Sequence, residues 1–212
     1  DSDSPPSAVA RIHQGMREGT IDILVGTQMV AKGHHFPNVT LLGIALAETT
    51  LAVPTHRAAE RTFQLIVQAA GRAGRGSKPG TVVVQTYDPE HPAISTAIAG
   101  DYEAFAAEEL RMRSQLAYPP FSRMVSVLFR ARSKDAAKKA AERFAGLLVK
   151  RDGLRLLGPA PEPIPRVAGR WRWHLTLLAS DWESAKKRVG EALEALGRRL
   201  GGVSVAVDVD PD

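Results

Sequence analysis

Short apolar runs alternate with longer amphipathic segments along the first half of the chain. The runs are residues 21–26, 41–47 and 81–87 (IDILVG, LLGIALA and TVVVQTY). Near-continuous apolar runs of this length are typical of strands that are buried on both faces of a parallel sheet. Helical periodicity predicts helices at residues 8–19, 56–70, 92–99 and 102–116. The order strand, helix, strand predicts a doubly wound α/β layer with a parallel sheet.

The order of elements changes after the pair Pro119-Pro120, which ends the preceding helix. Alternating patterns there predict strands at residues 125–132, 154–157, 171–179 and 203–209, and helices at 134–151 and 182–200. This β-α-β-β-α-β order is that of ferredoxin-like α+β domains. The proline-rich residues 158–165 predict an extended loop between the middle strands. We therefore expect one α/β domain at residues 1–118 and a smaller α+β domain at residues 119–212.

The charge is unevenly divided between these halves. Residues 1–118 hold 10 Lys and Arg against 12 Asp and Glu, a formal charge of −2, whereas residues 119–212 hold 18 against 11, a formal charge of +7. Clustered cations gain affinity for phosphates by releasing counterions, so a polyanionic partner of the second half is one interpretation. A basic surface that only keeps the protein soluble is the other.

Composition excludes several classes of protein and site. The chain of 212 residues has no cysteine, which removes disulfides, thiol nucleophiles and thiolate zinc sites from it. No apolar run approaches the roughly 20 residues that cross a bilayer, and the first residues lack the order of a signal peptide. We expect a cytoplasmic protein without membrane contact.

Two arginines stand three residues apart at the end of the predicted helix 56–70. The string Gln68-Ala-Ala-Gly71-Arg72-Ala-Gly-Arg75 places them in a turn with two glycines. Arginine offers planar, permanently charged donors that stabilise the charge on a transferring γ-phosphate. The order of residues resembles motif VI of superfamily 2 helicases, QxxGRxxR. The alternative is a helix cap whose arginines are merely exposed.

A second group of small and polar residues follows the run 21–26. Ligands of open α/β sheets bind at the carboxyl ends of the strands, where small and polar residues can offer N–H and hydroxyl groups to a nucleic-acid phosphate. With the helicase motif downstream, this segment resembles motif V, which implies that Thr27, Gln28 and Lys32 contact a nucleic-acid backbone. The neighbouring histidines, residues 34 and 35, have no third metal ligand at useful spacing. No metal site is therefore predicted in this chain.

The chain resembles the PriA (primosomal protein N′) family of replication-restart helicases from its first residue to its last. The similar segments are ILVGTQMVAKGHHFPNVTLLG, HRAAERTFQLIVQAAGRAGRG, GTVVVQTYDPEHPAI, GRWRWHL and VDVDP. The resemblance implies an incomplete second RecA-like helicase lobe followed by the carboxyl-terminal domain. It implies a parent that is an ATP-dependent 3′-5′ superfamily 2 DNA helicase, which restarts stalled forks by primosome assembly.

The resemblance also implies cofactors and partners. ATP and Mg²⁺ would be bound by the parent, with the phosphate-binding loop and the magnesium ligands outside this chain, so the chain alone is expected to be inactive. Zinc would belong to a cysteine-rich module that is not in this sequence. The implied partners are branched and single-stranded DNA, single-stranded DNA-binding protein and primosome proteins. The protein would be a monomer in the bacterial cytoplasm, associated with the nucleoid.

Roles follow from the resemblance residue by residue. Arg75 would be the arginine finger and Arg72 its partner at the phosphates. Cofactor-binding positions would be Gln68 and Gly71 in the same turn, and Gly33 and His35 near the nucleotide. Glu48 stands where the family pattern leads us to expect an aspartate, and we assign it no role.

Cationic and aromatic residues alternate at residues 170–173. On a strand, this alternation sends Arg170 and Arg172 to one face and the tryptophans to the other. We expect the arginines to bind DNA phosphates or an acidic peptide, joined on one face by Lys186 and Lys187 of the following helix. The alternative is that the tryptophans anchor a core and the arginines are only solvated.

Three functions remain open from the sequence. The first is the helicase motor. The second is an ATPase-deficient, DNA-binding platform for primosome assembly, because the deciding residues of the first lobe lie outside this chain. The third, a motor on RNA or a restriction-type translocase, shares the arginine turn but is disfavoured by the GRWRW and KGHHFP strings.

Overall fold

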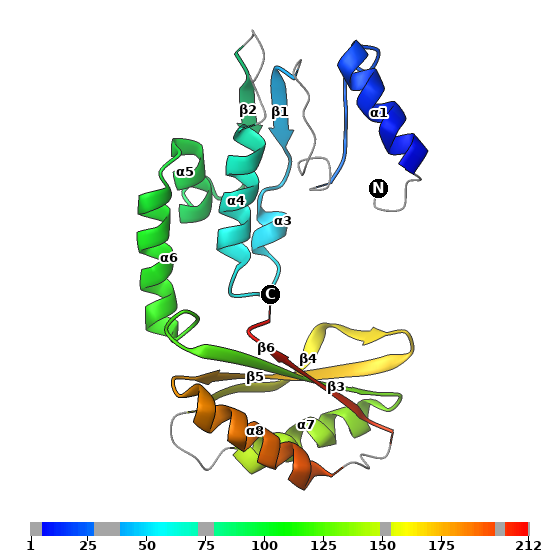
Figure 1. The fold of residues 1–212 in the computed structure, drawn as a ribbon, viewed down its shortest axis with the longest axis vertical. Helices are drawn as coiled ribbons and strands as arrows, with labels where there is room; N and C mark the ends of the chain where they lie inside the picture. Colours follow the sequence, from blue (N-terminus) through cyan, green and yellow to red (C-terminus); the bar gives the residue numbers. More distant parts are fainter. Residues whose placement is uncertain (1–5, 28–38, 72–78, 149–153, 198–201, 212) are drawn as a thin grey trace. The chain divides into compact units, whose positions relative to one another are not determined.

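The computed structural model describes residues 6–27, 39–71, 79–148, 154–197 and 202–211. The chain divides into two compact units, residues 1–109 and 110–212, and this division falls within helix α6 (Tyr102–Leu116) (Figure 1). The domain boundary that we place at residue 118 stays a prediction. Among the described helices, none is long and apolar enough to cross a membrane.

The first unit is built around a pair of parallel strands. Its elements are α1 (Pro6–Glu18), β1 (Leu41–Ile44), α3 (Glu48–Leu51), α4 (Ala58–Ala70), β2 (Thr81–Val84) and α5 (Pro92–Ala99), followed by the first part of α6. Strands β1 and β2 pair in parallel, with Leu41 opposite Thr81. Helix α4 is the crossover between them and lies beside both (Figure 1). This confirms the predicted α/β layer.

Helices α4, α5 and α6 supply the core of this unit. Helix α4 buries Phe63, Ile66 and Ala69 along one side, which is the spacing of a single helical face. Against them pack Ile94 of α5, which is fully buried, and Phe105 of α6, whose ring stacks on Phe63 with centroids 4.2 Å apart. Helix α4 ends at Ala70, directly before the predicted arginine turn.

The apolar run at residues 21–26 does not form a strand. Residues 21–27 are irregular, and the side chains of Ile23 and Val25 are 81% and 88% exposed. A buried strand needs neighbours that pair with its backbone and cover its faces. In the described part of the chain this sheet consists of β1 and β2, and residues 21–27 pair with neither. The prediction of a strand here is wrong.

The second unit is a four-stranded antiparallel sheet covered by two helices. Its elements are β3 (Arg123–Ala131), α7 (Lys134–Leu148), β4 (Leu154–Val167), β5 (Arg170–Ala179), α8 (Trp182–Leu196) and β6 (Ser204–Val209). The strand order is β4-β5-β3-β6, and both helices lie on the same face (Figure 1). The predicted β-α-β-β-α-β arrangement is confirmed.

Alternate residues of the central strands build the core of this unit. Val127 and Phe129 of β3, and Leu175 of β5, are fully buried against α7 and α8. The Phe129 ring meets Phe144 of α7 with centroids 5.6 Å apart. Because successive strand residues point to opposite faces, the intervening residues lie on the face away from the helices.

The proline-rich residues 158–165 belong to β4, so the prediction of a loop there is wrong. Strand β4 lies at the edge of the sheet and pairs only with β5. Proline lacks the N–H of a ladder bond and is tolerated on edge strands and at bulges. The pairing shifts register between Leu157 and Ala160 and again between Pro161 and Arg166. The edge position and these two irregularities accommodate the prolines.

Candidate nucleotide and nucleic-acid sites

The predicted nucleotide-facing turn begins at the end of α4. The Gly71 N–H donates a hydrogen bond to the Val67 carbonyl at 2.9 Å and so closes the last turn of the helix. Both Gln68 and Gly71 are exposed, while Ala69 between them is buried. The end of the packed helix is therefore exposed to solvent at Gln68 and Gly71.

Six of the predicted site residues lie outside the residues that the structure describes: Gln28, Lys32, Gly33, His35, Arg72 and Arg75. Thr27 is exposed at the end of the irregular segment 21–27. Since that segment is not a strand, the carboxyl edge at which we expected Thr27 does not form there. The ligand contacts of all seven residues stay predictions.

An interaction that the sequence did not predict lies at the carboxyl ends of β1 and β2. Glu48 begins the one-turn helix α3, which follows β1. Its carboxylate accepts hydrogen bonds from the Thr86 hydroxyl and from the backbone N–H groups of Tyr87 and Asp88, all of which follow β2. One side chain thus joins the loops that leave the two parallel strands.

These hydrogen bonds favour the ionised form of Glu48. The bond from Thr86, with further bonds from the backbone N–H groups of Glu48 itself, Tyr87 and Asp88, lowers the pKa of Glu48 from 4.5 to about 2. The sequence carried a weak signal for this arrangement, because an acidic residue follows one predicted strand and a hydroxyl residue, Thr86, lies near the end of the next. Nothing in the spacing said that the two would meet.

In the second unit, the tryptophans of the Arg-Trp-Arg-Trp string face the core. Trp173 is 9% exposed and belongs to the core under α7 and α8, and Trp171 packs against the same core. Lys134 and Lys138 of α7 lie over these rings, with ammonium nitrogens 5.5 and 5.9 Å from the respective centroids. The predicted separation of tryptophans and arginines onto opposite faces is confirmed.

The two arginines differ in their surroundings. Arg170 is exposed, whereas Arg172 is half-buried and its Nη2 lies 3.6 Å from Oε2 of Glu162 on β4. The other guanidinium nitrogen, Nη1, donates to the Ile164 carbonyl at 3.5 Å. His174, two residues along β5, places Nδ1 at 3.5 Å from Oε1 of the same glutamate. Arg172 is therefore held against β4 and is less available to a ligand than Arg170.

The structure does not bring the four predicted cations of this unit onto one face. Lys186 and Lys187 are exposed on α8, which packs against the tryptophan side of the sheet. Arg170 and Arg172 lie on the opposite side. The expectation of a shared face is wrong because sheet topology, which decides where α8 packs, is not visible in the spacing of residues. Their individual contacts with nucleic acid stay predictions.

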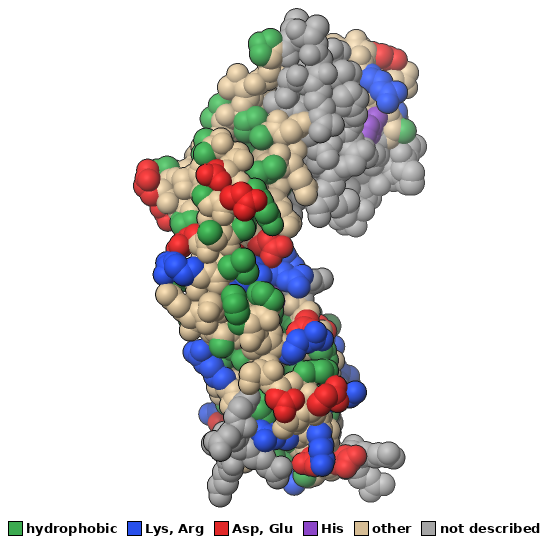
Figure 2. All heavy atoms as spheres, turned by 60° about the vertical axis from the view of Figure 1, so that its left-hand side comes forward, with side chains coloured by type: hydrophobic (Ala, Val, Ile, Leu, Met, Phe, Trp, Pro, Cys, Tyr) green, Lys and Arg blue, Asp and Glu red, His purple; other side chains and the backbone are tan. Residues whose placement is uncertain are grey.

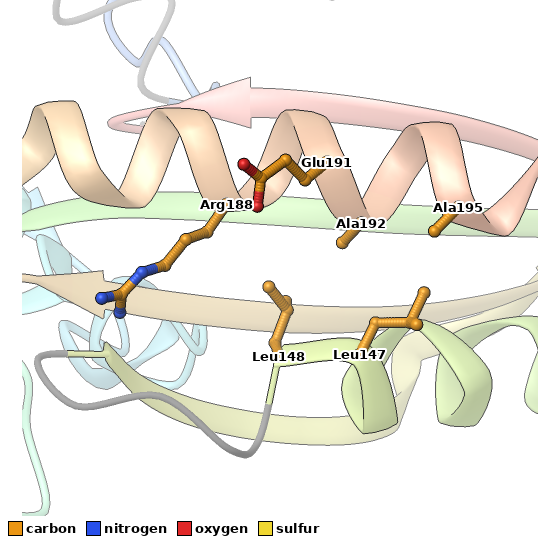
Figure 3. Close-up of a pocket in the computed structure, with 6 residues that line it drawn as sticks. All are labelled: Leu147, Leu148, Arg188, Glu191, Ala192 and Ala195. Carbon is orange, nitrogen blue, oxygen red and sulfur yellow. The ribbon is translucent and has the colours of Figure 1, made fainter.

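The surface of the second unit is mixed in charge on the side drawn in Figure 2, where basic and acidic side chains are interspersed. The described residues contain no group of three or more His, Cys, Asp or Glu side chains placed to hold a metal ion. A hollow of about 150 Å³ lies where Leu147 and Leu148 of α7 face Ala192 and Ala195 of α8 (Figure 3). It is smaller than the roughly 300–1,000 Å³ of most ligand pockets, and no predicted site residue lines it.

Comparison with known proteins relates both units to one family. Residues 114–212 match the family described as Primosomal protein N C-terminal domain. The whole chain is 38% identical to the replication restart protein PriA of Haemophilus influenzae. It is 42% identical over 96% of its length to the protein of that name from Treponema pallidum, and 37% identical over 99% of its length to that from Bacillus subtilis. The chain spans 29%, 31% and 26% of these three relatives.

Proposed function

The chain belongs to the PriA family of replication restart proteins, of whose members it covers the carboxyl-terminal part, and from this we propose that it is the corresponding part of an ATP-dependent DNA helicase that restarts stalled replication forks. The observation that carries the proposal is identity of 37–42% along essentially the whole chain, through both units. The fold supports it, because the family resemblance implies this architecture, a parallel β-α-β layer followed by an α+β domain.

In the proposed motor, the first unit contributes to the nucleotide site. Bound ATP with Mg²⁺ would supply the phosphoryl-transfer chemistry. Arg75 would stabilise the charge that develops on the γ-phosphate, and Arg72 would bind the phosphates beside it. Gln68 and Gly71, at the exposed end of α4, would orient this turn. Gly33 and His35 would approach the same nucleotide, while Thr27, Gln28 and Lys32 would hold the DNA backbone.

The second unit would engage the fork. Its formal charge of +7 over residues 119–212 supports contact with DNA, and Arg170 is exposed on the sheet face away from the helices. Movement in the 3′-5′ direction, recognition of branched and single-stranded DNA, and recruitment of single-stranded DNA-binding protein and primosome proteins follow the family resemblance. Activity as a monomer in the bacterial cytoplasm, near the nucleoid, completes the proposal.

Hydrolysis of ATP by the full-length parent tests this proposal against its alternative. We expect the parent to hydrolyse ATP when DNA is added and to separate the strands of a fork. The 212-residue chain should hydrolyse none under the same conditions, because its sequence has no phosphate-cradling G-x-x-x-x-G-K-[ST] loop. A parent that binds forks without hydrolysis is the assembly platform instead. Hydrolysis by the isolated chain would show that its architecture is misassigned.

A further inference from the structure

A carboxylate, that of Glu162, lies against the basic side chains on one face of strand β5. Glu162 lies on β4 opposite Arg172, with Oε2 at 3.6 Å from Nη2, while Oε1 lies 3.5 Å from Nδ1 of His174. The three side chains are between 21% and 28% exposed, so solvent reaches all of them. They lie on the sheet face away from α7 and α8, the same face that carries Arg170.

The bulge in β4 explains why Glu162 can reach this position. Pro161 pairs with Trp173 and Arg166 with Trp171, so the four residues between them stand opposite Arg172 alone. Two of these four are prolines and have no N–H to offer to β5. Arg172 spans the widened stretch by donating to the Ile164 carbonyl at 3.5 Å while its other nitrogen faces Glu162.

We propose that Glu162 competes with the DNA backbone for Arg172 and thereby limits the affinity of this sheet face for DNA. The inference rests on the proposed function, since it takes the DNA phosphate as the ligand. With Glu162 in place, the guanidinium is turned toward β4 and its charge is neutralised locally, leaving Arg170 as the exposed cation of the pair. When a phosphate binds, it replaces the carboxylate at Nη2 of Arg172.

The geometry suits an exchangeable partner. At 3.6 Å the contact is longer than the roughly 2.7–2.9 Å of a strong charge-assisted hydrogen bond. Partly exposed ion pairs of this kind are weak, because water screens them. A phosphate, like a carboxylate, offers the guanidinium two acceptor oxygens, and it brings further contacts along the DNA. The displaced carboxylate would then repel the phosphate, so Glu162 opposes binding in both states.

Duplex DNA binding by the 212-residue chain, titrated with salt, tests the inference. The variant Glu162→Gln removes the charge and keeps the side-chain size. The matched control is Glu142→Gln, which also removes one negative charge and releases one cation, Lys138 at 3.7 Å, but on α7 at the other side of the sheet. We expect E162Q to bind about threefold to tenfold tighter and its log–log salt slope to steepen by about 0.9, the value for one added phosphate contact. The double variant E162Q with Arg172→Gln should lose this gain, and E142Q should match the wild type.

The other outcomes contradict the inference in distinguishable ways. Equal tightening by E162Q and E142Q would mean that only net charge matters. Unchanged or weaker DNA binding by E162Q, or loss of cooperative unfolding in this variant, would mean that Glu162 only stabilises the bulge in β4. If no variant binds DNA at low salt, the DNA-binding role proposed for this unit fails together with the inference. If all bind equally, only the inference fails.

Discussion

The Glu48 carboxylate links the loops that follow the two parallel strands, and its low pKa makes this link depend on pH. A carboxyl whose pKa falls from 4.5 to about 2 on folding stabilises the folded state above pH 4.5 and loses that contribution as the pH falls toward 2. We predict that Glu48→Gln lowers the thermal midpoint at neutral pH. The difference from the wild type should shrink as the pH falls through that window, which thermal unfolding at a series of pH values measures.

A second glutamate provides the control for this measurement. Glu90 lies in the same loop region, is exposed, and changes the net charge equally when it is replaced by glutamine. Glu90→Gln should leave the midpoint close to that of the wild type at neutral pH. A deficit of E48Q that stays constant from neutral pH to pH 2 would show that the carboxylate is not the stabilising group.

Trp173 and Arg170 lie on opposite faces of β5 and should respond differently to truncation. Trp173 is 9% exposed within the core, so Trp173→Ala should cost about 3–5 kcal/mol of stability, as for other large core residues. Arg170→Ala should change stability by about 0.5 kcal/mol or less because its side chain is exposed. Chemical denaturation of the two variants decides the matter. Similar losses for both would mean that the string is not divided between core and surface.

The sequence predicted that the arginines and tryptophans of β5 lie on opposite faces, but it did not predict which side chains surround them. Period-two alternation is a local property of a strand, so the opposite faces of Arg172 and Trp173 followed from the residues alone. The pairing of Arg172 with Glu162 depends on the register between β4 and β5, which shifts at the bulge between Pro161 and Arg166. The bonds between Glu48 and residues 86–88 likewise depend on a contact across 38 residues or more. The spacing of residues along the chain does not show which side chains distant in sequence come into contact.

Among the elements, the register shift of β4 between Leu157 and Ala160 contains a glycine, Gly158, with no room for a side chain. Gly158 has φ of +96°, and a Cβ there would lie 3.0 Å from the His174 carbonyl oxygen and 3.1 Å from the Ala160 nitrogen. Gly158→Ala should therefore cost about 2–3 kcal/mol, combining backbone strain with these contacts. Thermal unfolding of the 212-residue chain measures the loss.

Gly169, in the turn between β4 and β5, separates the two causes. Its φ is +74°, yet nothing lies within 4 Å of an added Cβ. Gly169→Ala should cost about 1 kcal/mol from backbone conformation alone. If both alanine variants lose the same stability, the close contacts at Gly158 contribute nothing and the chain around it is packed less tightly than its geometry indicates.

The sequence predicted best those elements whose beginning, periodicity and end are all indicated by residues in or next to the element. Helices α5 and α6 begin and end at the predicted residues, since a proline opens one and turn residues follow both. Two errors concern strands, and the one-turn helix α3 was not predicted. Residues 21–26 have an apolar pattern without strand neighbours among the described residues, and residues 158–165 have strand geometry despite four prolines. Both outcomes depend on position in a sheet, which periodicity does not report.

At the scale of the whole molecule, the two units carry different parts of the proposed function. The first holds the end of α4, directly before the predicted arginine turn, and the second holds most of the positive charge. The glycines and arginines of residues 71–75 predict this turn, because they are residue types suited to a triphosphate site. The proposed contacts of Arg72 and Arg75 with a nucleotide could not be derived from spacing, because spacing does not say which parts of a fold meet.

Turnover of ATP by the full-length parent carrying Arg75→Ala tests whether this chain is part of a helicase motor. We predict that the variant still binds ATP but hydrolyses it about 10³-fold or more slowly in the presence of DNA, because the arginine acts on charge that develops only in the transition state. Arg17→Ala, which removes an exposed arginine from the last turn of α1, should keep the turnover of the wild type. Wild-type turnover by the Arg75→Ala parent would contradict the assignment of this chain to the motor.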